Sequence, residues 1–305
     1  MDQILSMRAF ARVVETGTFT QAASSLDMPK GTVTKLVQQL EARLKVRLLN
    51  RTTRRVTVTP DGAAYYERTL RLLNDLDDIE ASMSNAHATP SGRIRVDVGT
   101  SIARHIIIPA LPSFYARYPD IQLDLGVSDR LVDLMTEGVD CVLRAGDLTD
   151  QSLVARRIGN IHLVALASAD YIRQYGMPEH PRDLEGGRHR TVNYLAPRAS
   201  KPYLQEYEKD GERFEILGRN HLAVNEANAY TQAIILGLGI GQTAAFAVGP
   251  QLESGELVRV LPEWSRPAFP IYVVYPPNRH LSAKVRAFVD WAADLFARNK
   301  DLQGG

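Results

Sequence analysis

The 305-residue chain is too long for one small core and fits two or three domains. Its composition, 45% hydrophobic and 23% charged, is ordinary for a soluble protein, with no apolar run of the about 18 residues that a membrane span needs and no secretory signal pattern. The net charge of +1 conceals an asymmetry, because residues 1–59 hold ten Lys and Arg against four Asp and Glu, whereas the remainder holds 26 against 31. This basic head is predicted to bind a polyanion, although a solvated charged surface would give the same counts.

Three helices are predicted at the start of the chain. Residues 3–15 carry apolar side chains at helical spacing, and Gly17 should end this helix. Thr18 then starts a second helix with a T-x-x-Q capping box, in which the Thr18 hydroxyl caps a backbone N–H group and the Gln21 side chain reaches back to the cap residue. A third helix with an apolar inner stripe is expected at about residues 30–44.

Helix, tight turn, helix is the arrangement that places a recognition helix in the major groove of DNA. Four polar side chains lie off the apolar stripe of the third helix, near its N-terminus, where free N–H groups and the helix dipole favour phosphate. These side chains are Lys30, Thr32, Thr34 and Lys35. We predict that they contact DNA; Lys30 would bind a guanine edge or only a phosphate, and the alternative for the two threonines is a solvent-facing position.

A basic segment, RLLNRTTRRVTVTP, follows the third helix. Val56 and Val58 alternate with threonines, which predicts a short pair of strands with the arginines near its tip. Beside a helix-turn-helix, Arg51, Arg54 and Arg55 are expected to contact phosphates or the minor groove of DNA. Plain surface charge is the alternative for these three residues.

A long helix is predicted next, because Thr59 is a good N-cap and Pro60 suits the first helical position. It would span roughly 40 Å at 1.5 Å per residue. One seam repeats in heptads and consists of Tyr65, Thr69, Leu72, Leu76, Ile79, Met83 and Ala86. The seam predicts a contact between two chains, which would present two reading helices to two half-sites. Packing against the C-terminal domain of the same chain is the alternative.

Beyond a linker at residues 87–92, predicted strands and helices alternate. The strands are expected at residues 93–98, 122–127, 141–144, 161–167, 192–195, 221–224 and 271–275, and the helices at 101–117, 130–137, 226–236 and 282–297. This order predicts an α/β domain with a largely parallel sheet, built as two lobes with a cleft between them. Cys141, the only cysteine, excludes an internal disulfide, fits a reducing cytoplasm and is expected to be a small buried hydrophobe.

With these elements in place, the chain resembles the LysR-type transcriptional regulators. Four stretches carry the resemblance: FARVVETGTFTQAASSLDM, GTVTKLVQQLEARLKVRLLNRTTRRVTVTPDG, the G-R-I-R at 92–95 and the GLGIGQ at 237–242. The resemblance implies a cytoplasmic, sequence-specific DNA-binding regulator, usually a homotetramer, whose operator binding responds to a small effector. RNA polymerase is a further partner open to such a regulator.

The resemblance also implies three domains. They are a winged helix-turn-helix at residues 1–59, a dimerisation helix at 60–88, and an effector domain at 89–305 that is similar to periplasmic binding proteins. Within the last, lobe I would comprise about 92–160 and 269–298, and lobe II about 161–268. An effector that prefers one arrangement of the lobes would change the spacing or tilt of the DNA-binding heads.

Candidate site residues follow by position in the family pattern. The candidate DNA contacts are Thr18, Lys30, Thr32, Thr34, Lys35, Arg51, Arg54 and Arg55, and the candidate effector contacts are Thr100, Ser101, Ser128, Arg144 and Asn225. Hydroxyl donors and free N–H groups after strands would suit a carboxylate effector. The alternatives are helix caps for the serines, threonine and asparagine, and an ion pair for the arginine.

Other classes of function lack their sequence signatures. The seven histidines show no ligand spacing, so no metal site and no cofactor is proposed. The GLGIG at 237–241 follows a helix instead of a strand, and no nucleophile, P-loop or zinc-protease motif occurs, so an enzyme is not expected. Two other hypotheses remain: a solute-binding or enzymatic α/β domain with a helical extension, and a DNA-binding protein that takes no ligand.

Overall fold

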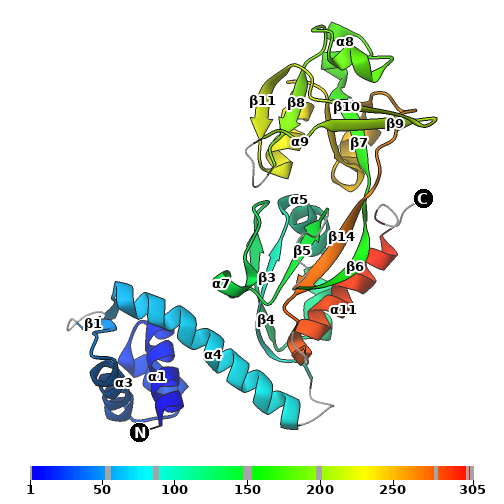
Figure 1. Cartoon of the computed structure of the whole chain (residues 1–305). Helices are drawn as coiled ribbons and strands as arrows, with labels where there is room; N and C mark the ends of the chain where they lie inside the picture. The colour runs from blue at the N-terminus through cyan, green and yellow to red at the C-terminus, as the bar shows by residue number, and fades with distance from the viewer. Residues whose placement is uncertain are drawn as a thin grey trace. The chain divides into compact units, whose positions relative to one another are not determined.

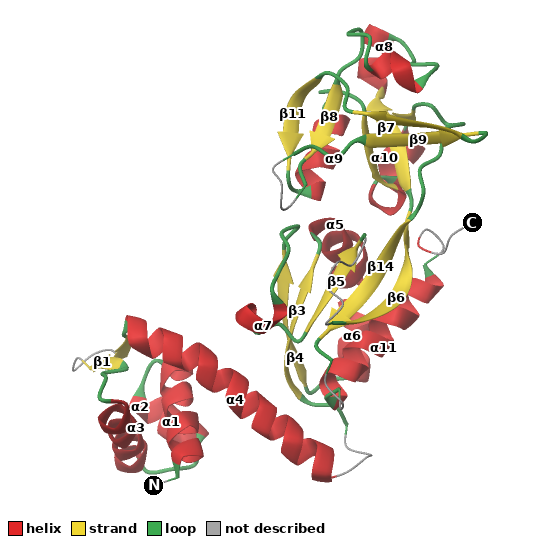
Figure 2. Cartoon of the chain, viewed as in Figure 1, coloured by secondary structure: helices red, strands yellow, loops and turns green. Residues whose placement is uncertain are grey.

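The computed structural model describes residues 2–51, 56–84, 89–146, 153–196, 201–277, 281–299 and 302. Contacts within the chain divide it into two units, Met1–Ala88 and Thr89–Gly305, and we describe each by itself (Figures 1 and 2). Among the described residues, no helix has both the length and the apolar character required to span a membrane.

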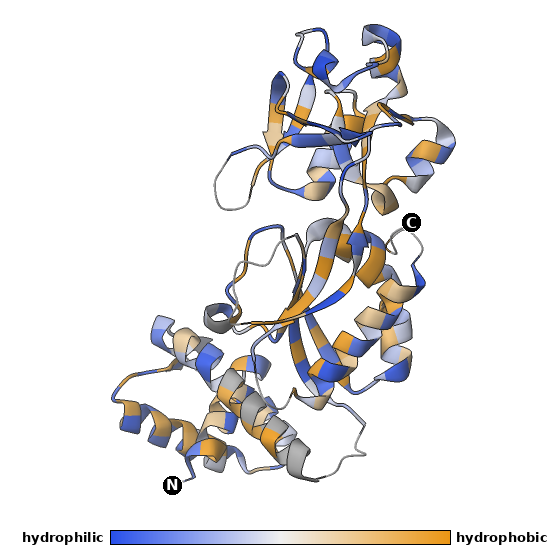
Figure 3. Cartoon of the chain, turned by 45° about the vertical axis from the view of Figure 1, so that its right-hand side comes forward, coloured by the Kyte–Doolittle hydropathy of each residue, from blue (hydrophilic) through white to orange (hydrophobic). Residues whose placement is uncertain are grey.

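The first unit is a small helical bundle with a two-stranded wing. Its elements are α1 (Gln3–Thr16), α2 (Phe19–Ser25), α3 (Lys30–Leu44), β1 (Leu49–Arg51), β2 (Val56–Val58) and α4 (Pro60–Ser84). The predicted ranges 3–15 and 30–44 agree with α1 and α3 to within one residue, whereas residues 85–88, the end of the predicted dimerisation helix, lie outside the described residues. Outside the grey part of α4, hydrophobic residues recur among hydrophilic ones along these helices, as in amphipathic helices (Figure 3). The side chains of Phe10, Val13, Val37 and Leu40 are fully buried between α1 and α3, and the small Ala22 lets α2 cross closely.

The helix ends of this unit follow from local chemistry. Gly17 ends α1 with a φ of 70°, a left-handed conformation that favours glycine. The Thr18 hydroxyl oxygen accepts a hydrogen bond from the Gln21 N–H at 3.2 Å. The second half of the predicted capping box is different: the Thr18 hydroxyl donates to the Gln21 side-chain oxygen at 3.2 Å. A hydroxyl can accept and donate at once, so the Gln21 side chain binds the hydroxyl instead of the backbone.

The wing is fixed to the third helix by Glu41. Its carboxylate accepts hydrogen bonds from the backbone N–H groups of Leu48 and Leu49 at 2.9 and 3.1 Å. Strand β1 then pairs antiparallel with β2, with Leu49 opposite Val58. The predicted strand pair is therefore present. Arg54 and Arg55, predicted near the wing tip, lie outside the described residues, as does the side chain of Arg51.

Helix α4 is capped by Thr59 as predicted, because the Thr59 hydroxyl accepts from the Gly62 N–H at 2.9 Å. The predicted seam is not uniform along this helix. Its first members are covered by their own chain: Tyr65 packs on Phe10 with ring centroids 5.7 Å apart, and Thr69 is only 3% exposed. Farther along, Leu72 is 50% exposed, Ile79 is 59% exposed and Leu76 is half-buried. The Met83 side chain and Ala86 lie outside the described part.

Lobe I of the second unit is built on a five-stranded sheet. In spatial order its strands are β4 (Ile121–Val127), β3 (Gly92–Val98), β5 (Cys141–Ala145), β14 (Phe269–Tyr275) and β6 (Val154–Ile161). The prediction of a largely parallel sheet is wrong in part. Strand β3 is parallel to β4 and β5, but β14 runs antiparallel to β5 and β6 because it returns from the other lobe.

Helices cover one face of this sheet. They are α5 (Thr100–Ile102), a π-helical turn at Ala103–Ile107, α6 (Ile108–Arg117) and α11 (Ala283–Arg298). The fully buried Phe114 of α6 and Phe288 of α11 meet edge to face with ring centroids 5.8 Å apart. The helix predicted at 130–137 is only α7 (Leu134–Glu137), because Asp133 caps a late start by accepting from the Thr136 N–H at 3.1 Å. Cys141 is fully buried, as predicted, and burial raises the pKa of its thiol.

The described residues of lobe II form three small sheets. They are β12 (Gly241–Ala244), β7 (Leu163–Ser168) and β13 (Leu257–Arg259) in that order; β11 (Asn220–Val224) with β8 (Thr191–Tyr194); and the hairpin of β9 (Gln205–Lys209) and β10 (Glu212–Ile216). Its helices are α8 (Ala169–Tyr175), α9 (Ala227–Ile235) and α10 (Gly249–Ser254), with short 3-10 turns at Pro181–Leu184 and Ala245–Ala247. The single strand predicted at 161–167 in fact combines the last residue of β6 with most of β7, and these two strands lie in different lobes.

Candidate DNA-binding face and interlobe site

Helix α3 has a buried face and an exposed face. Val33 and Val37 are fully buried against α1 and α2, whereas Lys30, Thr32 and Lys35 are exposed. The exposed side chains combine cations with a short hydroxyl near the N-terminus of the helix, where the dipole favours a phosphate. This face therefore has the chemistry that base edges and phosphates require.

The two threonines of this helix are in different environments. The Thr34 side chain is half-buried, and its hydroxyl donates a hydrogen bond to the Lys30 backbone oxygen at 2.9 Å. Its proton is thus used inside the helix, and only its acceptor lone pairs remain for another partner. Thr32 has no such bond to its own helix among the described contacts and is exposed. Of the two, Thr32 is the better placed to donate to DNA.

Gln38 is a residue that the sequence reasoning missed. It lies three positions after Lys35, so both side chains project from the same face of α3, and Gln38 is exposed. A glutamine side chain can bind the adenine edge with two hydrogen bonds. The i, i+3 spacing from Lys35 was the available signal.

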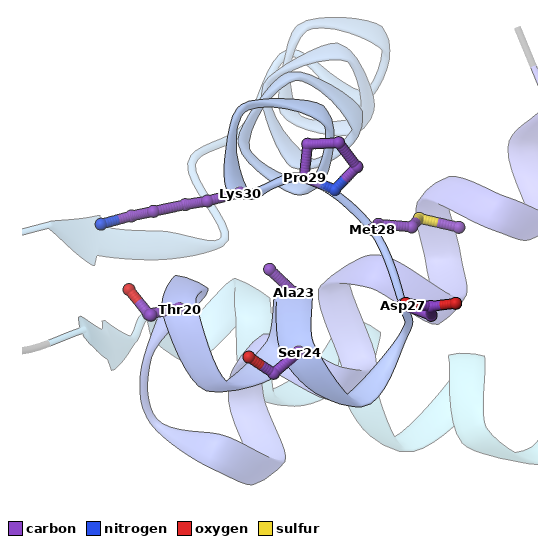
Figure 4. A pocket seen from close by; sticks show the side chains of 7 residues that line it. All are labelled: Thr20, Ala23, Ser24, Asp27, Met28, Pro29 and Lys30. Atoms are coloured by element: carbon purple, nitrogen blue, oxygen red, sulfur yellow. The ribbon is translucent and has the colours of Figure 1, made fainter.

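A hollow of about 380 Å³ lies between α2 and the start of α3. It is lined by Thr20, Ala23, Ser24, Asp27, Met28, Pro29 and Lys30. Figure 4 shows Thr20 and Ser24 from α2 and Lys30 from the first turn of α3 around this hollow. Thr18, the other candidate of this region, is exposed, and its hydroxyl is bonded to Gln21.

The second candidate site lies at the carboxyl ends of strands β3 and β4 in lobe I. These neighbouring parallel strands bring the predicted residues Thr100 and Ser128 to the same edge of the sheet. Thr100 is 8% exposed, and both its N–H and its hydroxyl donate to the carboxylate of Asp129, at 2.8 and 2.7 Å. The donors predicted for an effector at Thr100 are therefore already in use.

Asp129 also joins the two lobes. Its Oδ2 atom accepts a hydrogen bond from the N–H of Ala227, at the start of α9 in lobe II, at 2.7 Å. Next to it, Glu226 is the N-cap of α9 and accepts from the N–H groups of Asn228 and Ala229 at 2.9 and 2.7 Å. Sequence reasoning missed both acids. Glu226 was predicted as the first residue of the helix at 226–236, and an acid at a helix start was the available signal for its capping role. The bond of Asp129 to the other lobe depends on tertiary structure.

The other three candidate effector residues, Ser101, Ser128 and Asn225, differ in exposure and in hydrogen bonding. Ser128 is half-buried, and its hydroxyl is enclosed without a hydrogen-bond partner among the described residues; Ser101 is half-buried as well. Asn225 is exposed, and the alternative that it caps the following helix is wrong, because Glu226 has that role. Ser128 is thus the predicted effector residue with an unused buried donor.

Arg144 forms an ion pair, which was the alternative to effector binding for this residue. Its guanidinium forms an ion pair with Asp97 and donates to the backbone oxygens of Leu143 and Arg130, both at 3.1 Å. Only 14% of the Arg144 side chain and 9% of the Asp97 side chain are exposed. Removing one partner of such a buried pair would leave the other charge uncompensated, which gives this arginine a structural role.

The electrostatics of the interlobe site are dominated by its two carboxylates. Burial and the negative charges of Asp129 and Glu226 raise the pKa of Tyr194. Burial alone would raise the pKa of Glu226, but hydrogen bonds from Thr100 and from the backbone of Asn228 and Ala229 outweigh it and lower that pKa. The site therefore offers the carboxylate acceptors of Asp129 and Glu226 and the unpartnered hydroxyl of Ser128, beside a neutral Tyr194. These groups can hydrogen-bond to a small molecule.

A basic helix-turn-helix with a wing, a long helix and a two-lobed α/β domain together define a DNA-binding transcriptional regulator controlled by a small molecule. Family profiles agree with this class. The profile described as "Bacterial regulatory helix-turn-helix protein, lysR family" matches residues 4–63, and the profile described as "LysR substrate binding domain" matches residues 87–297. The chain belongs to the LysR family of transcriptional regulators.

Relatives and solved structures match over nearly the whole chain. An HTH-type transcriptional repressor of Pseudomonas aeruginosa is 42% identical over 99% of this chain and 95% of its own. The transcriptional activator AaeR of Escherichia coli is 29% identical over 97% of this chain and 94% of its own. The full-length structure of the Vibrio cholerae virulence activator AphB is 30% identical, covers 95% of this chain and 98% of its own, and has a TM-score of 0.60.

Proposed function

We propose that the exposed face of α3 reads the operator, with Lys30, Thr32 and Lys35 in contact with DNA and Gln38 as an additional base contact. The observation that carries this proposal is the exposure of these side chains on a helix whose opposite face is fully buried. Thr18 and Thr34 would add contacts by proximity to the same surface. The wing arginines Arg51, Arg54 and Arg55 complete the proposed set on the strength of their charge alone.

The proposed division of labour follows the two units. Residues 1–59 bind DNA, 60–88 form the helix that pairs two chains, and 89–305 bind the effector. The exposed Leu72 and Ile79 on α4 support the pairing role, because large apolar side chains on a helix surface gain from being covered. Two such pairs would form the tetramer, which acts in the cytoplasm on promoter DNA, with RNA polymerase as the further partner.

We further propose that the effector binds at the interlobe site without being chemically changed. The half-buried Ser101, the unpartnered hydroxyl of Ser128 and the exposed Asn225 supply hydrogen-bonding groups there, beside Thr100. Arg144 is left out of this set because its donors are engaged. An effector carboxylate would compete with Asp129 for the Thr100 donors.

The DNA-reading proposal is tested with Lys35→Glu. Duplexes that bind the unaltered chain are first selected from a random pool, and their affinities for the variant are then measured by fluorescence anisotropy. We expect the variant to bind at least about tenfold more weakly, because one cationic contact is lost and a repulsive one is added. The affinity of the unaltered chain should also fall steeply as salt rises from about 50 to 200 mM.

Lys201→Glu is the matched control, because Lys201 is equally exposed but lies in the second unit. It introduces the same charge change and should leave the affinity unchanged. Equal affinities for Lys35→Glu and the unaltered chain would exclude α3 as the reading helix.

A further inference from the structure

We infer that Asp129 is a latch that holds the two lobes of the effector domain together. Its carboxylate accepts hydrogen bonds from the N–H and the hydroxyl of Thr100, in its own lobe, and from the N–H of Ala227, in the other lobe, where the side chain of Tyr194 is a further partner. The three distances are between 2.7 and 2.8 Å. Hydrogen bonds to a charged group at this length are among the stronger ones in proteins.

Asp129 lies at the edge of the lobe I sheet that is farthest from the connections between the lobes. The chain passes between the lobes twice, after β6 and again before β14, and these two strands are neighbours at one edge of the lobe I sheet. Asp129 follows β4, which forms the opposite edge. With the hinge at one edge of the sheet and this hydrogen bond near the other, the bond lies where it resists separation of the two lobes most effectively, together with the contact of Thr100 with Glu226.

The partner of Asp129 in lobe II shows why a carboxylate suits this place. The first N–H groups of a helix have no partner in the helix and carry partial positive charge. Glu226 accepts from two of those groups in α9, at Asn228 and Ala229, and Asp129 accepts from a third, at Ala227. The start of α9 is therefore capped by one carboxylate from each lobe, and opening the lobes would leave the Ala227 N–H without its acceptor.

A local role for Asp129 is the alternative, since its bonds to Thr100 alone would order the loop after β3. The two roles predict different consequences. Loss of a local cap would affect lobe I only, whereas loss of a latch would affect both lobes and the distance between them. The regulatory meaning of the latch rests on the proposed effector site: an effector that binds there would favour the closed or the open lobes by adding to or replacing the Asp129 contacts.

The test measures the distance between the lobes in the full-length chain, with neither DNA nor effector present. Spin labels are placed through Ala116→Cys on α6 and Gln174→Cys on α8, both exposed positions, while the buried Cys141 is not labelled. The labelled chain is diluted into excess unlabelled chain, so that only distances within one chain are recorded. Asp129→Asn and Asp129→Ala are each compared with the unaltered residue.

We expect both variants to broaden the distance distribution towards longer distances, with the larger effect in Asp129→Ala. Hydrogen exchange of the Ala227 amide should accelerate about tenfold or more, as loss of a charge-assisted bond predicts. The Asn228 and Ala229 amides, which Glu226 caps, should change much less. The control, Asp120→Asn, removes an exposed carboxylate from the same lobe and should change neither measurement.

An unchanged distance distribution, or faster exchange confined to Thr100, would overturn the latch. If Asp129→Ala does not fold, Asp129→Asn decides, because its shape is conserved. Since no DNA or effector enters the experiment, a negative result would count against the latch and leave the proposed regulatory function as it stands.

Discussion

At the scale of single residues, Gly62 shows how closely the DNA-binding unit is packed. A β-carbon placed on Gly62 would lie 2.0 Å from the backbone oxygen of Leu48. That oxygen also accepts a hydrogen bond from the Thr59 N–H at 3.0 Å. The start of α4 is thus held against the segment that leads into the wing, at a distance that only glycine permits.

We therefore expect Gly62→Ala to lower the free energy of unfolding by about 1–3 kcal/mol, because the backbone must move to admit a methyl group. Gly31→Ala is the control: it is also helical, and no atom lies within 4 Å of its added β-carbon. Alanine there should raise the free energy of unfolding by about 0.5–1 kcal/mol. Urea titration followed by circular dichroism compares the two, and equal effects would contradict this account of Gly62.

The residue scale also shows where prediction from sequence succeeds. Thr18 and Thr59 were identified as caps, and Gly17 as a helix end, because the chemistry of a helix terminus is local and is written in three or four consecutive residues. Asp129 was missed because its acceptor role depends on Ala227, 98 positions away in the chain. Arg144 was predicted as an effector contact because its ion-pair partner, Asp97, is 47 positions away in the chain and reaches it only when β3 and β5 pair.

At the scale of elements, the surroundings of α4 change along its length. Its beginning packs on α1 of the same chain, whereas Leu72 is half exposed. We expect Leu72→Asp to weaken self-association by at least about tenfold, because an unpaired carboxylate in an apolar contact is costly. Sedimentation velocity across a range of protein concentrations measures this. Arg68→Asp, on an exposed part of the same helix, is the control; a Leu72→Asp variant that sediments like the unaltered chain would exclude a contact through Leu72.

Elements with a strong hydrophobic period were predicted well, and charged strands were not. Helix α3 and strand β5 have clear apolar patterns and were placed within a residue or two. Strands β9 and β10, QEYEK and ERFEI, carry charges on most alternate positions and were missed. They exist because they pair with each other along a hairpin of five residues each, an interaction that no single-strand pattern reveals.

At the scale of the whole molecule, each unit has its own hydrophobic core. One core is built around Phe10 and Leu40 in Met1–Ala88, and separate cores fill Thr89–Gly305. We expect calorimetry of the full-length chain to show two unfolding transitions. Operator DNA should raise the temperature of one and an effector that of the other, because a ligand stabilises the unit that binds it.

Gly62→Ala assigns the transitions, since it should lower only that of the DNA-binding unit. A screen of carboxylates, aromatic compounds and amino acids against the second transition would also identify the effector class. A single transition that DNA and small molecules shift together would contradict the independence of the two units.

The position of β14 has a consequence for synthesis of the chain. It lies between β5 and β6 in the finished sheet, yet the ribosome makes it only after all of lobe II. During synthesis, β5 and β6 therefore lack the strand that joins them, although the DNA-binding head and most of lobe II have already emerged. Chaperones that shield unpaired strand edges would find their substrate here, in the interval before residue 275 leaves the exit tunnel.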